Sequence, residues 1–482
     1  MKYVFGLDLG TTTIKATMFD ETGRPVADDA VERTLLMPQP GYLEQDAEQW
    51  FTDSAMVIRN AVQKSGVDPR DIVGLSISSQ GITLVPVSED QKAMANAINW
   101  MDNRPVEQLK RLIDAVSVDR IFHTTGKDGH SPAYSITKLM WFKDNMPEIY
   151  EKARWFLMPM DFVTMKLTGN VVTDHSMAAG GMCYSLADAA WDDEIIAAAG
   201  VKKSLLPEIK WAGESAGHLT AEAAAACGLT TDCIVAVGGQ DQKVAAFGAK
   251  IAPGVVTFSM GTCGAFEFLL DAPKAHPDRA LTLCPHVEPN KWVLEGCINT
   301  VGGAIKWCRD NVCPGLSYVD MNVEAEKAAP GSGGAFFYPF LAGRGTPHHE
   351  SGTPAGGYTG LALHTTRADL IRSVYEGIAY ESRLNLEAAE VLVGKIQQIN
   401  AFSGGSKGAI VCRILAEVTG CTVHSYAYAE MGNLGAARLA AKACGLDWEA
   451  FGEPMLADSR DTVPSELQPE YDALFREYCK KL

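Results

Sequence analysis

Asp241 lies in a stretch, Val237–Thr262, whose residue types and spacing could support acid–base chemistry on a phosphorylated ligand. Gly238–Gly239 precede it and allow a tight turn close to a ligand. Asp241 and its neighbour Gln242 could together accept a proton from a substrate hydroxyl. The strand-like run that follows ends in Gly261–Thr262, a turn with amide N–H groups and a hydroxyl, as in anion sites. This pattern indicates phosphoryl transfer, although an N-cap Asp and an ordinary β-turn would look the same.

A second acid and a second glycine turn stand at the start of the chain. Tyr3–Leu9 is β-rich and carries Asp8 near its end, and Ile14–Asp20 predicts the other strand of a β-hairpin. The hairpin lacks the GxxxxGK[ST] spacing of a P-loop. Its turn can still bind phosphate through backbone N–H groups, hydroxyls and an ammonium, supplied by Thr11, Thr12, Thr13 and Lys15. Asp8 could order Mg²⁺ through water. A polar hairpin tip without a ligand is the alternative.

Two more glycine turns precede helices in the second half of the chain. Asn299–Gly303 is a turn that contains Gly302 and Gly303 and leads into a helix. The strand Ile399–Phe402 ends in a turn that contains Gly404, Gly405 and Ser406, and the helix Ile410–Thr419 follows. A strand, a Gly-Gly turn and a helix N-terminus in this order indicate a nucleotide-facing site.

Candidate sugar-binding residues stand earlier in the sequence. Gln80 and Gly81 follow the predicted strand Val73–Ser78, and the Gln80 amide could contact a polyol hydroxyl. Asp102 and Arg104 follow Trp100, and an acid, a guanidinium and an aromatic ring together suit a sugar. The alternatives are a turn residue at Gln80 and a surface ion pair of little energetic value at Asp102–Arg104.

Composition limits the class of protein. The length of 482 residues predicts two domains, and the net charge of −17 argues against a nucleic-acid or anionic-membrane partner. The 12 cysteines are scattered without a CxxC pair, which favours reduced thiols and hence the cytoplasm. The start, MKYVFGLDLG, does not look like a signal peptide, and no apolar run is long enough to cross a bilayer.

The elements that must position these residues form two similar halves. Each half reads as a strand, a glycine–hydroxyl turn, a strand and then helices, which predicts an α/β fold of two domains, 1–249 and 250–482, around a nucleotide cleft. We also expect a strand over Ile82–Val87 and a long helix over about Arg367–Val393. The charged tail beyond about Glu449 is expected only to pack on the surface.

With these motifs in hand, the chain resembles the FGGY family of carbohydrate kinases, over about residues 3–445. That family has two ribonuclease-H-like domains of the sugar kinase/Hsp70/actin fold. Phe5–Lys15 resembles the first phosphate motif of the family, and Ser259–Thr262 resembles the second. Val237–Gly248 resembles the segment with the catalytic Asp, Gly357–Leu361 the C-terminal signature, and Ser403–Ser406 the adenosine motif. These motifs in this order are far more specific than any one glycine turn.

The resemblance implies transfer of the ATP γ-phosphoryl group to a hydroxyl of a sugar, ketose or polyol, with Mg²⁺. It assigns Asp241 as general base and Asp8 as the residue near the metal. It implies that the phosphates are held by Thr11, Thr12, Gly261 and Thr262, and that the nucleotide is bordered by Gly302, Gly404 and Gly405. The sugar-side candidates are Gln80, Asp102, Arg104 and Gln242. Dimers are common in the family, which leaves a homodimer open.

The substrate is the least determined property. Gly81–Ile82 stands where glycerol kinases carry an Arg-Glu pair, and Ala133 stands in place of their tyrosine. The Met-His of xylulose kinases is missing too. A ketose is favoured, with a xylulose-like pentulose first; ribulose, fuculose, rhamnulose and erythritol stay open, and glycerol comes last. One alternative is a non-catalytic sugar- or nucleotide-binding regulator, disfavoured because Asp8, Asp241 and both phosphate turns are present. Another is a chaperone-type or actin-like ATPase, disfavoured by the sugar-like Trp100–Arg104 element, the carboxylate at Asp241 and the lack of a peptide-binding domain.

Overall fold

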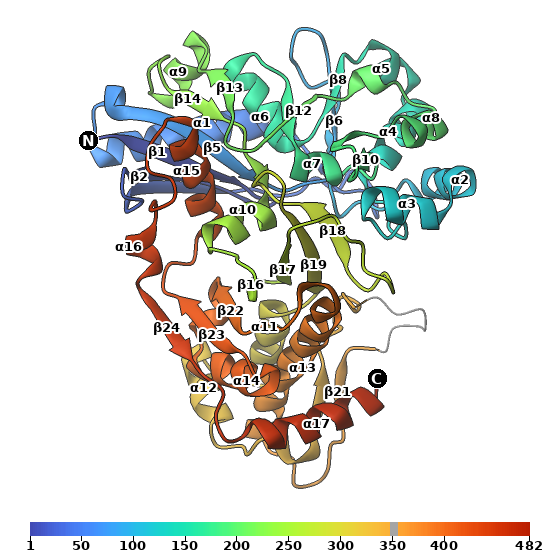
Figure 1. Cartoon of the computed structure of the whole chain (residues 1–482), viewed down its shortest axis with the longest axis vertical. Coiled ribbons are helices and arrows are strands. Elements are labelled where there is room, and N and C mark those ends of the chain that lie inside the picture. The colour runs from blue at the N-terminus through green and yellow to red at the C-terminus, as the bar shows by residue number, and fades with distance from the viewer. Residues whose placement is uncertain (348–354) are drawn as a thin grey trace.

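The computed structural model describes residues 1–347 and 355–482. The chain is built around two seven-stranded sheets, one in the upper and one in the lower part of the molecule (Figure 1). The helix α10 (Asp241–Gly248) lies between these two parts. The predicted α/β class is confirmed, whereas the boundary between residues 249 and 250 stays a prediction.

The first sheet has the order β13-β14-β5-β1-β2-β3, and β15 also pairs with β5. Its strands are β1 (Tyr3–Leu9), β2 (Thr13–Asp20), β3 (Pro25–Glu32), β5 (Ile72–Ser79), β13 (Ser215–His218), β14 (Ile234–Ala236) and β15 (Gly239–Gln240). The strands β1, β2 and β3 form an antiparallel meander, and β5 and β14 continue it in parallel. The predicted hairpin of β1 and β2 is confirmed.

The second sheet repeats this pattern with the order β18-β19-β17-β16-β22-β23-β24. Its strands are β16 (Val255–Met260), β17 (Gly264–Leu270), β18 (Thr282–Pro285), β19 (Trp292–Ile298), β22 (Gln398–Phe402), β23 (Thr422–Tyr426) and β24 (Ser459–Thr462). The strands β16, β17 and β19 form the antiparallel part, and β22 and β23 are parallel to β16. The two halves therefore place equivalent turns, β1–β2 and β16–β17, at equivalent positions.

Helices and short two-stranded sheets surround the two large sheets. In the first half the helices are α1 (Ala47–Ser65), α2 (Val106–Val116), α3 (Val118–Thr125), α4 (Ser135–Asn145), α5 (Pro147–Lys152), α6 (Pro159–Thr168), α7 (His175–Ala179), α8 (Asp193–Ala199) and α9 (Ala221–Cys227). In the second half they are α11 (Gly302–Asn311), α12 (Tyr318–Ala325), α13 (Arg367–Val393), α14 (Ala409–Thr419), α15 (Met431–Ala443), α16 (Glu453–Leu456) and α17 (Gln468–Lys480). The short paired strands are β4 (Glu44–Gln45), β6 (Val85–Val87), β7 (Ala97–Ile98), β8 (Trp155–Leu157), β9 (Val172–Asp174), β10 (Tyr184–Ser185), β11 (Ala190–Trp191), β12 (Glu208–Lys210), β20 (Phe336–Tyr338) and β21 (Gly357–Thr359).

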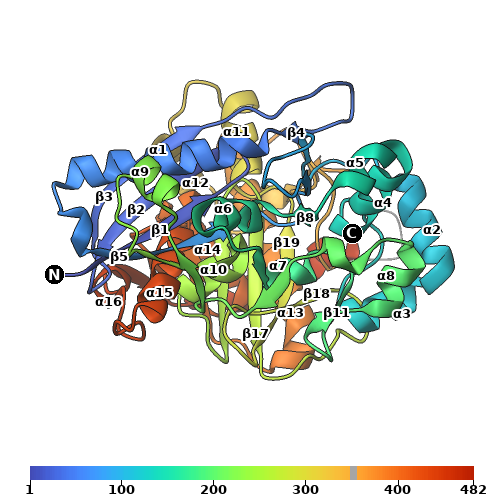
Figure 2. The same ribbon diagram turned by 90° about the horizontal axis from the view of Figure 1, so that it is seen from above.

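The helix α15 crosses back from the C-terminal half and packs on β1 and β5 of the first sheet. It covers the face opposite to α1 (Figure 2). The approach is close: the Nδ2 of Asn433 donates hydrogen bonds to the carbonyls of Gly6 and Lys15, both at 2.9 Å. A Cβ on Gly6 would lie 1.9 Å from the carbonyl oxygen of Asn433, so only glycine fits there. A helix from beyond the predicted boundary thus covers one face of the first sheet.

The expected long helix is confirmed as α13, whose bounds match the prediction. Thr366 caps it, because its hydroxyl accepts from the Asp369 N–H while the Asp369 carboxylate accepts from the Thr366 N–H. The predicted strand over Ile82–Val87 is wrong at its start: only Val85–Val87 is a strand, and Ile82 has φ 66°. The left-handed backbone at Ile82 ends the extended conformation there.

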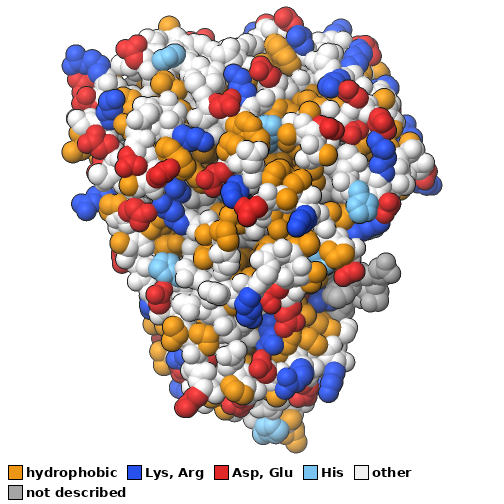
Figure 3. Space-filling view, viewed as in Figure 1, with side chains coloured by type: hydrophobic (Ala, Val, Ile, Leu, Met, Phe, Trp, Pro, Cys, Tyr) orange, Lys and Arg blue, Asp and Glu red, His pale blue; other side chains and the backbone are white. Residues whose placement is uncertain are grey.

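The tail is more than a surface segment, so that prediction is wrong. The strand β24 extends the second sheet, and Tyr471 and Tyr478 of α17 belong to its buried core. The charged residues that suggested an exposed tail occupy one side of an amphipathic helix, and the tyrosines occupy the other. Among the described residues, no helix has both the length and the apolar character of a membrane span. Acidic and basic side chains are interspersed over the face that Figure 3 shows.

Candidate active site

Asp241 is the first residue of α10, directly after the short strand β15. Gln240 caps the helix: its side-chain oxygen accepts from the Gln242 and Lys243 N–H groups, and its Nε2 donates to Asp241 Oδ1. The Gln242 N–H also donates to Asp241 Oδ1, at 2.7 Å. Both hydrogen bonds hold one carboxylate oxygen, so the side chain has a defined orientation at the helix N-terminus.

The turn before Asp241 is held by a hydrogen bond to α7. Ser176 Oγ accepts from the Gln240 N–H at 2.9 Å and donates to Asp174 Oδ2 at 2.8 Å. Asp174 also accepts from the Ser176 and Met177 N–H groups, so it caps α7. These residues look like plain scaffold in the sequence. The DHS order, an acid before a hydroxyl at a helix start, is a capping signal that gives no hint of Gln240.

The electrostatics of the site centre on two carboxyl groups. Burial raises the pKa of Asp241 to about 7, with a further rise from the nearby Asp8 and a fall from Lys243. Burial also raises the pKa of Asp8 to about 6, although the Ser78 hydroxyl donates to Asp8 Oδ1 at 2.9 Å. A carboxyl group with a pKa near neutrality is suited to accept and release a proton at physiological pH.

A cavity of about 610 Å³ opens in the C-terminal half. All of its lining residues lie between residues 260 and 411, from the β16–β17 turn, α11, α12, α13 and the segment around the 3₁₀ helix Gly404–Lys407. The predicted nucleotide residues Gly261, Thr262, Gly302, Gly303, Gly404 and Gly405 all line it. The volume is within the range of small-molecule sites.

The glycines that line the cavity have different local roles. Gly302 and Gly303 donate their N–H groups to the carbonyls of Gly261 and Thr262 at 2.8 and 3.0 Å, so they fix the turn between β16 and β17. A Cβ on Gly302 would lie 2.6 Å from the Gly261 carbonyl oxygen, whereas one on Gly404 would meet no atom within 4 Å. Ser406 is buried and its hydroxyl donates to the Ser403 carbonyl. Its side chain therefore points into the protein, in place of the nucleotide contact that the sequence suggested.

The hairpin residues predicted to hold phosphate lie outside this cavity lining. Thr12 and Thr13 are exposed at the β1–β2 turn, and Lys15 is paired with Glu430 at 3.4 Å. Thr11 Oγ1 donates to Gln80 Oε1 at 3.1 Å and accepts from the Trp100 indole N–H at 2.8 Å. The hairpin turn is thus tied to the sugar-side residues.

A buried amide network surrounds Gln80, which is only 2% exposed. Its Oε1 accepts from Thr11 Oγ1, and its Nε2 donates to Gln45 Oε1 at 3.0 Å. Asn99 Nδ2 donates to the same Gln45 oxygen at 3.1 Å. The Gln80 amide is therefore used within the protein. Gln45 and Asn99 were missed, because isolated amides in a sequence carry no signal of a shared network.

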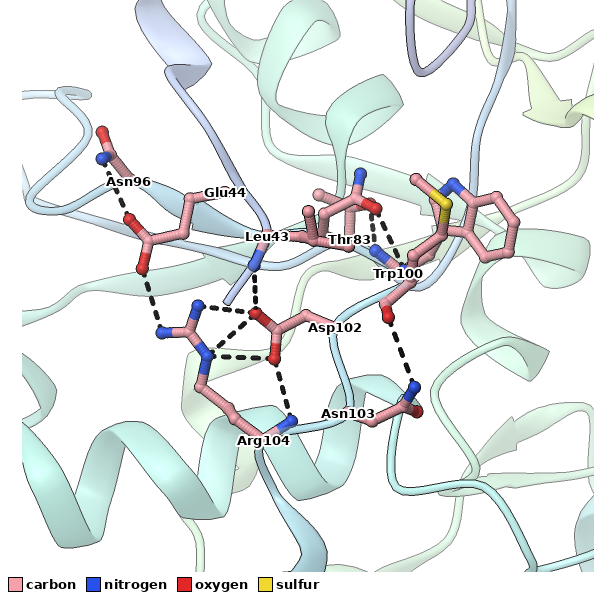
Figure 4. Close-up of polar contacts among 10 residues, drawn as sticks. Leu43, Glu44, Thr83, Asn96, Trp100, Asp102, Asn103 and Arg104 are labelled. Atoms are coloured by element: carbon pink, nitrogen blue, oxygen red, sulfur yellow. Dashed lines mark hydrogen bonds and ion pairs between the residues drawn. The ribbon is translucent and has the colours of Figure 1, made fainter. Parts of the chain in front are cut away.

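Asp102 and Arg104 form a buried pair, as Figure 4 shows. Asp102 is 0% exposed and accepts from the Leu43 N–H at 2.7 Å and from the Arg104 guanidinium at 2.6 Å. Arg104 also pairs with Glu44 at 3.0 Å and stacks over the Tyr42 ring at 3.6 Å. We therefore assign the pair to fixing the loop that carries Trp100, in place of the direct sugar contact that the sequence suggested.

The remaining residues that the sequence predicted to contact a sugar are Gln242 and Gly81. Gln242 is partly exposed next to Asp241 on α10. Gly81 is buried, and a Cβ there would approach the Gln240 side chain to 3.3 Å. Trp100 is 39% exposed and bonded to Thr11, so an aromatic surface stands at the end of the amide network. Asp241, Gln242, Trp100 and the hairpin turn together offer a carboxylate, an amide, a ring and hydroxyls.

Comparison with known proteins places this site in a family context. The N-terminal domain model of the FGGY family of carbohydrate kinases matches residues 3–248, and the C-terminal domain model matches 256–444. A xylulose kinase of Lactococcus lactis is 28% identical over 92% of this chain and 89% of its own. The crystal structure of a gluconate kinase from Lactobacillus acidophilus has a TM-score of 0.91 at 26% identity, covering 99% of this chain and 97% of its own. A ligand-bound xylulose kinase of the same organism has a TM-score of 0.90 at 26% identity, covering 100% and 97%.

Proposed function

Because the chain belongs to the FGGY family of carbohydrate kinases, we propose that it transfers the γ-phosphoryl group of ATP to a hydroxyl of a neutral ketose, with Asp241 as general base. A xylulose-like pentulose is the favoured substrate. The observation that carries this proposal is the position of the partly exposed Asp241 carboxyl at the start of α10, where desolvation raises its pKa to about 7. The family implies a kinase that uses ATP and an alcohol acceptor.

The proton of the substrate hydroxyl would pass to Asp241 Oδ2. Gln240 and the Gln242 N–H both donate to Oδ1, so among the described residues Oδ2 is the oxygen left to accept. Phosphoryl transfer depends mainly on alignment and charge neutralisation, so one positioned carboxylate and two phosphate turns suffice. The helix N-terminus also favours negative charge as the hydroxyl becomes an oxyanion.

The nucleotide would occupy the cavity of about 610 Å³. Gly404 offers open backbone there, and the turn Gly261–Thr262 faces the phosphates. Tyr375 and Val411 line the cavity and provide apolar surface for the adenine ring. The Tyr375 hydroxyl donates to Asn322 Oδ1 at 2.9 Å. The Asn322 amide N–H groups are therefore left as donors toward the adenine ring.

Mg²⁺ fits the residues around Asp8. The Asp8 carboxyl is raised in pKa by burial and by Glu430, so a cation beside it would relieve the cost of its charge. The described residues contain no cluster of three or more His, Cys, Asp or Glu that would form an all-protein cage. Mg²⁺ commonly uses one or two carboxylates together with water and substrate phosphates. When bound, it would neutralise charge on the phosphates.

The side chains on the sugar side favour a neutral substrate. Gln80, Gln45, Asn99 and Thr11 are uncharged and hydrogen-bonded to one another. The Arg104 guanidinium is already paired with Asp102 and Glu44, so it is not available to a substrate carboxylate. A hydroxyl-rich ligand at the partly exposed Thr11 and Trp100 would meet no unpaired charge from the buried amides behind them, so no charge would have to be desolvated. The likeness to xylulose kinases supports a ketose of this kind.

Lys127 favours an acidic sugar as the second candidate. It is 5% exposed and its ammonium donates to Cys284 Sγ at 2.7 Å, a weak acceptor for a buried cation. A substrate carboxylate would be a better partner. The likeness to a gluconate kinase is consistent with this alternative. Against it, Lys127 is also within electrostatic range of Glu267 and Glu295, whose carboxyl groups compete for its charge.

The test is coupled ADP release with Mg²⁺-ATP over a sugar panel: D- and L-xylulose, ribulose, fuculose, rhamnulose, erythritol, glycerol and D-gluconate. We expect sugar-dependent ADP release with a neutral ketose, xylulose first, and a rate lower by about 10²–10⁴-fold in the Asp241→Asn variant. Turnover with gluconate alone would support the Lys127 alternative. If no sugar in the panel stimulates ADP release while ATP still binds, the kinase proposal would be overturned in favour of a regulator.

A further inference from the structure

A buried ion cluster joins α10 to the second sheet beside Asp241. Lys243 lies two residues after Asp241 and is only 2% exposed. Its Nζ is 2.7 Å from Glu295 Oε2 on β19 and 3.2 Å from Glu267 Oε1 on β17. No sequence pattern singles out Lys243, because its partners stand far along the chain in the second sheet.

The two glutamates are unusual neighbours. Glu267 and Glu295 lie directly opposite each other on adjacent antiparallel strands, where two like charges destabilise a sheet. Glu267 is 1% exposed, and neither of its carboxylate oxygens forms a hydrogen bond among the described residues. Without a cation between them, this part of the second sheet would carry uncompensated buried charge.

Their protonation follows from this geometry. Burial raises the pKa of Glu267 to about 8, so this carboxyl holds its proton at neutral pH. Burial also opposes ionisation of Glu295, but Lys243 and Lys127 outweigh it and lower the pKa of Glu295. The working ion pair at neutral pH is therefore Lys243–Glu295, with a neutral Glu267 beside it.

We propose that Lys243 is a positioning residue for Asp241: its ion pair with Glu295 fixes the first turn of α10 against the second sheet, and its ammonium favours the anionic form of the Asp241 carboxylate. This inference rests on the proposed function, in which Asp241 is the base. Apolar contacts of Ala246 and Ile251 with Cys284 and Val293 join α10 to the same sheet farther along. They would keep the helix docked when the ion pair is removed.

The charged and titratable groups that face this pair come from several elements. Asp241 is faced by Asp8 on β1, by Glu295 on β19 and by Lys243 on its own helix. Lys243 is faced by Glu267, Glu295, Cys284, His286 and Asp174, and Lys127 faces the two glutamates. Lys243 is thus the positive charge that acts on Asp241, and Glu295 and Asp8 are the negative ones.

The experiment measures kcat and KM for both substrates against pH in four proteins: wild type, Lys243→Met, Glu295→Gln and Glu267→Gln. Removing the Lys243 charge should move the acidic limb of the kcat profile up by about one pH unit, because a nearby opposite charge shifts a carboxyl pKa by about 1–3 units. Glu295→Gln should move this limb in the opposite direction. Glu267→Gln is the matched control, since its carboxyl is already neutral, and it should keep the wild-type limb.

The outcomes separate this inference from the proposed function. Opposite shifts in Lys243→Met and Glu295→Gln support it, with ATP KM changed less than twofold. A lower kcat with an unmoved limb in both variants would overturn it and make the cluster purely structural. If Lys243→Met does not fold, the inference is tested by Glu295→Gln alone: a shift of the acidic limb to lower pH supports it, and an unmoved limb overturns it. Wild-type turnover in Asp241→Asn would instead overturn the assignment of the base.

Discussion

Asp241→Asn removes the proposed base while keeping the size of the side chain and its ability to accept at Oδ1. General-base catalysis typically contributes about 10²–10⁴-fold, so kcat should fall by about that factor. The cavity for the nucleotide is lined by residues 260–411 and does not include Asp241. ATP affinity should therefore change little, and the loss should appear in kcat.

The same substitution has a consequence for stability that depends on pH. The folded pKa of Asp241 is raised from 3.8 to about 7, so the folded state binds the proton more tightly than the unfolded state. Below pH 3.8 both states are protonated and the group contributes nothing. The cost of the buried charge grows from there to about pH 7, to at most about 4 kcal/mol, since one pKa unit is worth about 1.4 kcal/mol.

The assay combines coupled ADP release with thermal melting at pH 5 and pH 8. We expect the Asn variant to lose turnover and to melt at the same or a higher temperature than wild type, with the larger gain at pH 8. Wild-type kcat should fall below about pH 7, where Asp241 takes up a proton. An Asn variant with wild-type turnover would refute the base assignment, and a larger gain in melting temperature at pH 5 would refute the raised pKa.

Three further predictions follow from single contacts. Ser176→Ala removes the acceptor of the Gln240 N–H, so kcat should fall about tenfold in steady-state assays with both KM values within twofold, a loss typical of one buried hydrogen bond. Asp102→Ala removes one of the two carboxylates paired with the buried Arg104 guanidinium, leaving Glu44, and should lower the free energy of unfolding in urea by about 1–3 kcal/mol; an unchanged free energy of unfolding with a raised sugar KM would restore the direct-contact hypothesis. Gly302→Ala should raise the ATP Kd in calorimetry and lower the melting temperature, because its Cβ meets the Gly261 carbonyl, whereas Gly404→Ala should raise the Kd without lowering the melting temperature, because its Cβ, beside the cavity, meets no protein atom within 4 Å; an unchanged Kd in both variants would contradict this placement of the nucleotide.

Local sequence signals were sufficient for several elements. The hairpin of β1 and β2 follows from a glycine–threonine turn between two β-rich segments, and the helix α13 follows from apolar residues at helical spacing. The repeat of strand, turn and strand in both halves was visible for the same reason. The prediction of an exposed tail was wrong, because Tyr471 and Tyr478 are buried only through packing against the core of the second half.

The candidate site divides in the same way. The order of motifs in the sequence determined which residues could act on phosphate and which carboxylate could act as a base, since these roles depend on residue type and on adjacent turns. Only the tertiary structure decided what each side chain touches. Ser176 reaches Gln240 across 64 positions, and Lys243 reaches Glu295 across 52. Burial, ion pairing and pKa depend on such long-range neighbours, and a linear sequence does not record them.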